Sequence, residues 1–584
     1  MSMTLPKAWR IAPAAPGSFV RNSSSISPIL AQVLYNRGLS DPAQIPAYLN
    51  GGEIAAGSFL SLRRTANSSI DRALARIKQA IRTGEQIAVY GDFDADGVTS
   101  TALMMQVLRS LGANVIPYIP HRVDEGYGVN SEALLRLSRS GVRLVITVDC
   151  GIRSVDEVDE GRRYGLDIII TDHHSLGPEL PRAYALINPK LDDLDYSEDM
   201  LAGVGVAFRL CEALLTISGS NGIRRSSAGP RIAPEDLLDL VAIGTVADLA
   251  PLNRSENRAL VKRGLMALNE AKRPGIRALM EVAGLRQGQV KSESIGFGLG
   301  PRINAAGRLE SAMIAYQLLA TDDDQEAYRL ARRLQDLNTL RQELTRTAQE
   351  SIRTALNLEM MQSPLIFASG HFQPGIVGLV AGRLTEEFYR PAIVMEMGDT
   401  ESRASCRSIP QFDITGALDE CAGLLVRHGG HAQAAGFTVR NENIPALQAQ
   451  LSEIAARSLE GTALIPTLDI DCELDPADMT LSLAETLQLL EPTGHDNPPP
   501  VFATRGMRIS DVRTVGREEQ HLKLRLERSH SAPIDAIGFH LGGGDWRVGD
   551  YVDVAYTLDI NEWNNSRTVQ LKLQDVRMHQ PKDE

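Results

Sequence analysis

The segment QIAVYGDFDADG, residues 86–97, decides the fold of this 584-residue chain. Its opening residues are mostly apolar and β-branched, and they predict a short buried strand. Acidic residues follow at once, at Asp92, Asp94 and Asp96. Residues 98–112, VTSTALMMQVLRSLG, then carry apolar side chains at helical spacing. The segment therefore predicts a strand, an acidic loop and a helix in succession.

Three more apolar runs repeat this pattern downstream. They are NVIPYIP at 114–120, RLVITVDCG at 143–151 and LDIIITDHH at 166–174, and helical segments separate them. Strands that alternate with helices are typical of an α/β fold with a doubly wound, mainly parallel sheet. We predict such a sheet for the first large domain.

Polar, metal-binding residue types stand where these strands end. The carboxyl ends of neighbouring parallel strands meet at one edge of the sheet, which is where open α/β sheets bind ligands. A crowd of carboxylates there would repel itself without cations, and oxygen ligands with imidazole suit Mn²⁺ or Mg²⁺. Single aspartates could instead be turn residues or helix caps. Taken together, the strand ends predict a site for metal ions, and Asp248, which follows an apolar helix, could supply one more carboxylate. The candidate ligands at the strand ends are Asp92, Asp94, Asp96, Asp149, Asp172, His173 and His174.

Downstream of this sheet the pattern changes twice. Residues 323–357 lack Gly and Pro and predict one long helix. A second α/β unit follows, and the tail carries short alternating stretches typical of a small β-barrel. We expect five parts: an extension packed on the first domain at 1–65, the first α/β domain at 66–318, a connecting long helix at 319–358, the second α/β domain at 359–462, and the barrel at 463–584.

Composition sets outer limits on function. Apolar residues make up 43% and charged residues 23%, and no run approaches the roughly 20 apolar residues that span a bilayer. We therefore expect no membrane anchor. Five cysteines without a CxxC pair, and no signal-peptide pattern at the start, favour the cytoplasm. The net charge of -13 alone argues against nucleic-acid binding, although a basic groove or bound cations can offset it locally.

The motifs resemble those of a known superfamily. GDFDADG, TVDCG, TDHH and GTVADLAPL resemble, in order, the four motifs of the DHH phosphoesterases. GPRINAAGR at 300–308 and GHFQPGIVGLVAGRL at 370–384 are similar to RecJ single-stranded-DNA exonucleases. RHGGHAQAAGF at 427–437 resembles the glycine- and histidine-rich element of the associated DHHA1 domain, and the tail resembles an OB-type barrel.

This resemblance implies two divalent ions, Mn²⁺ or Mg²⁺, bridged by Asp149. Asp94 would bind one ion, and Asp96, His173 and Asp248 would bind the other. The other catalytic candidates are less specific: His174 would lie beside the scissile phosphate or orient a ligand, and the role of Asp92 stays open. Asp172 would orient a neighbouring ligand. His431 would act from the second α/β domain.

Phosphate-binding residues are expected in both halves. Fixed donors in a glycine-flanked loop around 300–308, and glycines that admit an anion to the backbone, suit phosphate oxygens. The candidates are Arg122, Arg302, Asn304, Arg308, Ser405, Arg407, His428, Gly429 and Gly430. Of these, Ser405 and Arg407 resemble the family's pocket for the 5′ end. For Arg122 and Arg407 a solvated surface ion pair is the competing interpretation. In the tail, Phe539, Trp563 and Lys523 could contact bases or phosphates.

The leading hypothesis is a 5′→3′ exonuclease on single-stranded DNA that acts in repair and recombination. It would work as a monomer, with a single-stranded-DNA-binding protein and a helicase as family-expected partners. A phosphoesterase for small substrates such as pyrophosphate, cyclic dinucleotides or oligoribonucleotides is one alternative, and a non-catalytic nucleic-acid scaffold is another. The long chain argues against the first, and the full ligand set argues against the second.

Overall fold

The chain folds into two compact units. The computed structural model describes residues 5–51, 68–122, 124–126, 128–191, 200–220, 232–356, 363–516, 519–528, 532–563 and 566–580. One unit comprises Ala47–Leu344 with Glu491–Pro498, and the other comprises Met1–Pro46, Thr345–Leu490 and Pro499–Glu584. In the described part of the chain, no helix is both long and apolar enough to cross a membrane.

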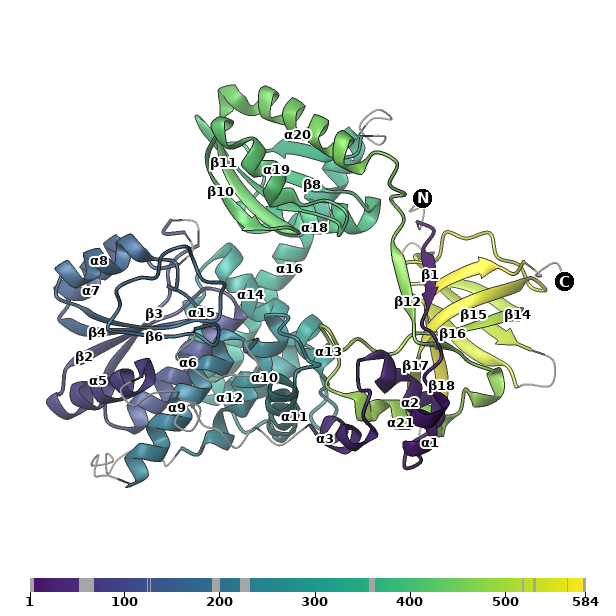
Figure 1. The fold of residues 1–584 in the computed structure, drawn as a ribbon, viewed down its shortest axis with the longest axis horizontal. Helices are drawn as coiled ribbons and strands as arrows, with labels where there is room; N and C mark the ends of the chain where they lie inside the picture. The colour runs from purple at the N-terminus through teal and green to yellow at the C-terminus, as the bar shows by residue number, and fades with distance from the viewer. Residues whose placement is uncertain are drawn as a thin grey trace. The chain divides into compact units, whose positions relative to one another are not determined.

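A five-stranded parallel sheet is the centre of the first unit (Figure 1). Its strands are β2 (Gln86–Tyr90), β3 (Asn114–Tyr118), β4 (Val142–Val148), β5 (Asp167–Thr171) and β6 (Ala185–Ile187), and they lie in the order β3-β2-β4-β5-β6. The order reverses direction beside β2, so β2 and β4 form the switch point of the sheet. This confirms the expected doubly wound fold.

Helices cover both faces of this sheet. On one face lie α5 (Ser69–Thr83), α6 (Ala95–Ser110) and α9 (Gly203–Ser220), which share one hydrophobic core with β2 and β4. On the other lie α7 (Ser131–Arg139) and α8 (Val155–Arg163). Because both faces are covered, the central strands are apolar on every side: Leu144, Val145 and Ile146 are fully buried.

Helices complete the first unit beyond the sheet. In chain order they are α10 (Leu238–Ala247), α11 (Ser255–Glu270), α12 (Pro274–Val282), α13 (Ser292–Ser294), the π-helix η3 (Ile295–Leu299), α14 (Gly300–Leu309) and α15 (Met313–Ala320). The short α3 (Ile45–Asn50) lies against α11, where Arg258 donates to the carbonyl of Tyr48.

The predicted long helix at 323–357 is α16, which runs from Asp324 to Ala355. The carboxylate of Asp323 accepts the backbone N–H of Glu326 at 2.7 Å and satisfies one of the free donors at the helix start. Leu330, Leu334 and Leu337 follow at spacings of four and three residues, and all three are buried. This apolar stripe is what an amphipathic helix needs in order to pack.

The second α/β domain is a mixed sheet with helices. Its strands lie in the order β10-β11-β9-β8-β7, and only β7 and β8 pair in parallel. The elements are β7 (Ile366–Gly370), α18 (Val377–Phe388), β8 (Ala392–Glu396), β9 (Glu401–Arg407), α19 (Ile414–Glu420), β10 (Leu425–His431), β11 (Ala434–Arg440) and α20 (Ile444–Leu459). Strand β10 is therefore an edge strand, paired on one side only among the described residues.

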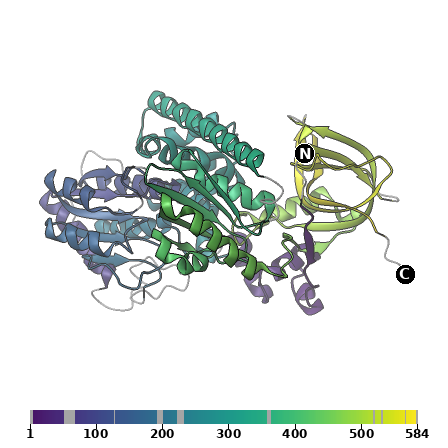
Figure 2. The ribbon, with the colours of Figure 1, turned by 90° about the horizontal axis from the view of Figure 1, so that it is seen from above.

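The tail forms a closed five-stranded barrel, seen as a ring in Figure 2. Its strands are β14 (Phe502–Val515), β15 (His521–Glu527), β16 (Ile534–Gly538), β17 (Tyr551–Trp563) and β18 (Ser566–Met578). Pairing of β14 with both β15 and β17 closes the ring. The small helix α21 (Leu481–Leu487) precedes it.

The N-terminal extension divides into two parts: α3 lies against α11 of the first domain, whereas the start of the chain pairs with a later segment. Strand β1 (Ala8–Ile11) pairs in parallel with β12 (Thr467–Ile470), next to the barrel. The indole N–H of Trp9 donates to Asp575 of β18 at 2.6 Å. A free strand edge offers unpaired backbone groups, and here two short segments far apart in sequence satisfy each other.

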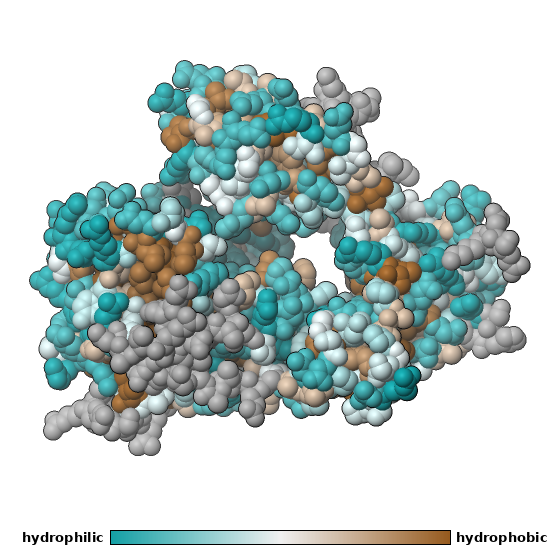
Figure 3. Space-filling model, viewed as in Figure 1, coloured by the Kyte–Doolittle hydropathy of each residue, from teal (hydrophilic) through white to brown (hydrophobic). Residues whose placement is uncertain are grey.

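The face seen in Figure 3 is largely hydrophilic, with scattered apolar patches. Among the large apolar side chains exposed on the described part of the protein, Phe297 of the π-helix η3 is 82% exposed. Gly296 and Gly298 flank it in the sequence.

Candidate metal centre

Strands β2, β4 and β5 are neighbours, and each ends in residues of the predicted site. Asp92, Asp94 and Asp96 follow β2, Asp149 follows β4, and the Asp172–His174 segment follows β5. Because these strands are parallel, their carboxyl ends lie at one edge of the sheet, beside its switch point. The local sequence pattern is thus enough to gather the residues.

Three groups of side chains could each hold a cation. Potential ligand atoms within 4.8 Å of one another occur in Asp92, Asp94 and Asp149, in Asp96, His173 and Asp248, and in Asp149, His173 and His174. Asp149 and His173 each belong to two of these groups. The five residues predicted to be metal ligands therefore lie close to one another, and Asp92 lies with them. That they bind metal stays a prediction.

Several ligand atoms are buried and lack a hydrogen-bond partner among the described residues. They are Oδ1 of Asp92, Oδ1 of Asp149 and Nε2 of His173. Nε2 of His173 lies 3.2 Å from Oδ1 of Asp149 and 3.8 Å from Oδ2 of Asp248. Buried polar atoms are normally paired, so unpaired ones that face each other across a few ångströms fit bound cations.

The electrostatics of the site support the same conclusion. Burial, and then the charge of Asp94, raise the pKa of Asp96 to about 7. Burial and neighbouring carboxylates also raise the pKa values of Asp92, Asp149 and Asp248 well above the ordinary range. Burial lowers the pKa of His173 to about 3, so its imidazole is neutral and free to bind a metal. In their charged form, these carboxylates need positive charge that the side chains of the site do not supply, which bound cations would provide.

Asp149 has an unusual backbone. Its φ is +63°, in the left-handed region that non-glycine residues rarely adopt. Its N–H donates to the carbonyl of Thr171 at 3.0 Å, which fixes the strained turn to the neighbouring strand. Strain of this kind persists where the surroundings over-determine it, most often at functional sites.

Two helix N-termini hold the carboxylates of Asp94 and Asp96. Oδ1 of Asp94 caps α6 by accepting the N–H groups of Asp96 and Gly97, at 3.0 and 3.1 Å. The carboxylate of Asp96 accepts the N–H groups of Gly203 and Val204, at 2.7 and 2.8 Å, at the start of α9. Helix N-termini favour negative charge, so α6 and α9 stabilise the ligands as carboxylates.

Sequence analysis missed two glycines that make room for this site. A Cβ on Gly203 would lie 2.5 Å from Oδ1 of Asp149, and a Cβ on Gly244 would lie 2.8 Å from Oδ1 of Asp96. Neither distance is possible without displacing a ligand. Only their glycine identity hinted at this role, and many glycines in the chain share that identity.

Asp172 holds its two histidine neighbours. Its Oδ1 accepts the N–H of His173 at 2.7 Å and lies 2.8 Å from Nδ1 of His174. Burial alone would raise the pKa of Asp172, but its hydrogen bond with His174 and that residue's charge lower it. The same contact raises the pKa of His174 despite burial. Asp172 therefore orients His174. The prediction that it orients a metal ligand stays a prediction.

Arg122 lies near the acids. Its guanidinium stacks 4.0 Å from the ring centroid of Phe93, and burial lowers its pKa although Asp92 and Asp94 act in the opposite direction. This largely buried position does not fit a solvated surface ion pair.

The segment 300–308 is helical and not the glycine-flanked loop that we expected. Gly300 and Pro301 begin α14, and buried Ile303 and Ala306 pack its inner side. Pro suits the first turn of a helix, which explains why the GP pair starts a helix here.

The polar residues of α14 have different surroundings. Arg302 donates to Gln335 at 2.8 Å and to the carbonyl of Gly298 at 2.7 Å, both neutral acceptors. Oδ1 of Asn304 accepts the N–H of Ala95 at 2.7 Å, and so supports the acidic loop. Arg308 lies in the last turn of α14.

The remaining candidates lie in the second α/β domain. A Cβ on Gly378, in the first turn of α18, would lie 3.0 Å from Oγ of Ser405 and 3.3 Å from Nη2 of Arg407. These side chains of β9 therefore face the start of α18. Nε2 of His428 lies 2.8 Å from Asp419. In the edge strand β10, Gly429, Gly430 and His431 are exposed.

Three further predictions concern the tail. Phe539 is 53% exposed, and its ring packs edge-on against His521 at 5.2 Å between centroids. Lys523 lies on β15, opposite Arg513 of β14. The side chain of Trp563 lies outside the described residues.

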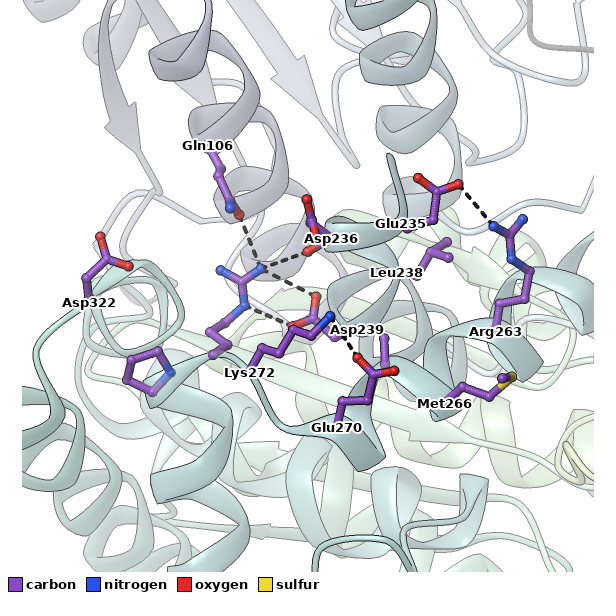
Figure 4. A pocket seen from close by; sticks show the side chains of 13 residues that line it. Gln106, Glu235, Asp236, Leu238, Asp239, Arg263, Met266, Glu270, Lys272 and Asp322 are labelled. Carbon is purple, nitrogen blue, oxygen red and sulfur yellow. Dashed lines mark hydrogen bonds and ion pairs between the residues drawn. The ribbon is translucent and has the colours of Figure 1, made fainter. Parts of the chain in front are cut away.

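A separate hollow lies among α10, α11 and α12 (Figure 4). Its volume is about 400 Å³, and none of the predicted site residues lines it. Its charged side chains pair with one another, as Arg273 does with Asp239 at 3.1 Å and Lys272 with Glu270 at 2.8 Å. It is distinct from the acidic site.

Comparisons with known proteins agree with this architecture. The DHH family N-terminal domain matches residues 86–245, the DHHA1 domain matches 362–457, and the RecJ OB domain matches 470–575. The single-stranded-DNA-specific exonuclease RecJ of Escherichia coli is 36% identical, over 95% of this chain and 96% of its own. RecJ of Bacillus subtilis is 37% identical, over 94% of this chain and 68% of its own.

A solved structure gives the same result in three dimensions. The crystal structure of RecJ from Thermus thermophilus in complex with Mn²⁺ superposes with a TM-score of 0.83 at 30% identity, covering 98% of this chain and 80% of that one. The Mg²⁺ complex of the same protein superposes with a TM-score of 0.77, covering 98% of this chain and 79% of that one. Sequence identity, fold and acidic site agree along the whole chain, which therefore belongs to the RecJ family.

Proposed function

We propose that this protein is a single-stranded-DNA-specific exonuclease that removes nucleotides in the 5′→3′ direction, in DNA repair and recombination. The observation that carries the proposal is the acidic site, with overlapping cation-binding groups at the switch point of a RecJ-type sheet. RecJ relatives match the chain from the sheet through the barrel, which disfavours a phosphoesterase for small substrates and a scaffold without catalysis.

The metal set is proposed to be two Mn²⁺ or Mg²⁺ ions. Asp92, Asp94 and Asp149 would hold one, and Asp96, Asp149, His173 and Asp248 would hold the other. Such ions activate water and stabilise charge on phosphate oxygens when bound. Including Asp92 among the ligands rests on its burial and its unpaired Oδ1.

The chain's own residues would then position the phosphate. Asp172 keeps His174 oriented by its contact with Nδ1, and the raised pKa of His174 favours the charged form that attracts a phosphate oxygen. Arg302 contributes because its hydrogen bonds to Gln335 and to the carbonyl of Gly298 leave its charge uncompensated.

A pocket for the 5′ phosphate is proposed at the start of α18. Ser405 and Arg407 face that helix turn, and burial lowers the pKa of Arg407, whose neighbours are mostly neutral. Helix N-termini and arginine forks both bind phosphate. The exposed segment with His428, Gly429, Gly430 and His431 would contact the backbone of the strand.

Partners and location belong to the same proposal. We infer a monomer that works with a single-stranded-DNA-binding protein and a helicase on DNA. The cytoplasm fits the five cysteines, all of them free.

An end-label assay tests the proposal. Single-stranded DNA, blunt duplex and a dinucleotide, labelled at either end, are incubated with the enzyme and Mn²⁺. We expect immediate release of the label from the 5′ end of the single strand, little cleavage of duplex and slow cleavage of the dinucleotide. Preferential cleavage of the dinucleotide would contradict the proposal, and early release of a 3′ label would reverse the polarity.

A further inference from the structure

A fourth strand also ends at the metal edge of the sheet. Strand β6 pairs in parallel with β5, so its carboxyl end lies beside the Asp172–His174 segment. The residues that follow β6 are Asn188, Pro189 and Lys190. Sequence analysis did not single them out, because they lie outside the motifs that carry the acids and histidines.

The side chains of Asn188 and Lys190 donate hydrogen bonds to the backbone of the two histidines. Nδ2 of Asn188 donates to the carbonyl of His174 at 2.9 Å, and Nζ of Lys190 donates to the carbonyl of His173. Asn188 is fully buried, and its Oδ1 accepts the N–H of Lys190 at 2.9 Å. Both side chains thus bind consecutive backbone carbonyls, and the Asn188 side chain also fixes the backbone of Lys190.

The lysine also brings a positive charge to the site, because its ammonium group lies at the backbone carbonyl of His173, a predicted metal ligand.

We propose that Asn188 and Lys190 are positioning residues that hold the His173–His174 backbone in the geometry for metal binding. The inference rests on the proposed metal site. A carbonyl held from outside cannot rotate, so the imidazole of His173 keeps its direction toward Asp149 and Asp248. Removing a group that orients a metal ligand typically weakens metal binding by 10- to 100-fold.

The test is Mn²⁺ binding, followed by the electron paramagnetic resonance signal of the free ion. Lys190→Met removes the donor and the charge at similar length, and we expect about tenfold weaker binding. Activity should recover largely at saturating Mn²⁺, because Lys190 acts through His173. Lys190→Arg keeps charge and donor and should bind Mn²⁺ within about threefold of the wild type.

Control variants make each outcome decisive. Lys272→Met removes an exposed lysine of the same unit and should leave binding unchanged. If Lys190→Met fails to fold, Asn188→Leu tests the same contact, since it removes the donor to His174 at similar volume without adding a charge. Wild-type Mn²⁺ affinity in Lys190→Met or Asn188→Leu, or equal losses in Lys190→Met and Lys190→Arg, would overturn the inference. Asp149→Asn separates the two ideas: if it too binds Mn²⁺ normally, the metal site itself is wrong.

Discussion

At the scale of single residues, the acidic site concentrates negative charge that the protein alone does not balance. Asp92, Asp96 and Asp149 are each at most 3% exposed, and several of their neighbours are also carboxylates. Burying a charge without a partner costs several kcal/mol, so such groups stay protonated or bind cations. Any substitution that removes one of these acids therefore alters both metal binding and the charge balance of the metal-free protein.

Catalysis should depend strongly on Asp149, since it is the carboxylate that two of the three potential cation-binding groups share. Asp149→Asn should reduce the cleavage rate on the order of a thousandfold or more, because both ions lose a ligand. Rates on 5′-labelled single-stranded DNA under single-turnover conditions measure this. Asp156→Asn, at an exposed position on α8, is the control. Near-normal turnover by folded Asp149→Asn would refute the site.

The raised pKa values predict how stability depends on pH. A carboxylate whose pKa rises to about 7 on folding, as for Asp96, binds a proton more tightly in the folded state. Below the unfolded-state pKa of about 4, this group makes its full contribution to the free energy of unfolding. That contribution is lost as pH rises through about 7, with a slope of up to about 1.4 kcal/mol per pH unit. Metal-free protein should therefore melt at a lower temperature at about pH 8 than at about pH 5.5.

Bound Mn²⁺ should reverse this trend, because the ion requires the deprotonated ligands. Thermal unfolding with chelator and with Mn²⁺, at both pH values, measures the two slopes. Asp96→Asn should flatten the metal-free slope. A metal-free protein that gains stability with rising pH in this window would show that the acids are not coupled as described.

At the scale of elements, strand ends and helix starts assemble the site. The start of α9 donates two N–H groups to Asp96, and its first residue, Gly203, lies against Asp149. One helix therefore sets the relative position of two carboxylates from different strands.

Gly203→Ala tests that role. The new methyl group would lie 2.5 Å from Oδ1 of Asp149, so either the helix or the carboxylate must move. We expect loss of metal affinity by about 10- to 100-fold, with the fold retained. Calorimetric titration with Mn²⁺ measures it. Gly205→Ala, where the atom nearest to the new Cβ is Cδ2 of Leu201 at 3.1 Å, is the matched control. Equal affinities in the two variants would remove Gly203 from the site.

Elements also show where sequence reasoning succeeds and where it fails. The strand ends and α16 were predictable because their signals are local: an apolar run, a polar terminus, or a repeating stripe. The pairing of β1 with β12 was not, since Arg10 and its partner Asp469 are 459 positions apart and both strands are short. The role of Gly203 depends on how closely its backbone approaches Asp149 in the folded protein, and the sequence does not reveal such a contact.

At the scale of the whole molecule, an acidic protein has to bind an acidic polymer. The net charge is -13, and many basic residues of the barrel pair with acids, such as Arg508 with Glu527 and Arg505 with Glu473. Few basic residues then remain to contact the phosphates, so stacking of bases on aromatic side chains should contribute a larger share of the binding free energy. In OB-folds the second and third strands carry the oligonucleotide face, which here means β15 and β16. Phe539 follows β16 and is exposed beside His521.

This distribution predicts that DNA length decides which residues matter. A strand of about 5 nucleotides should depend on the metal unit, whereas one of about 30 should also engage the barrel, since one OB-fold covers roughly 4–16 nucleotides. Phe539→Ala should weaken binding of the long strand by about tenfold, because stacking on one base contributes roughly 1–3 kcal/mol, and should leave cleavage of the short strand unchanged.

The affinity for the long strand should also fall more steeply with salt, by about 0.7 in logarithmic slope for each additional neutralised phosphate. Fluorescence anisotropy of both strands across a salt series, with Met578→Ala as an exposed barrel control, measures both effects. Identical salt slopes for the two lengths, together with unchanged binding by Phe539→Ala, would mean that the barrel does not hold the strand and that the grip lies wholly in the two α/β domains.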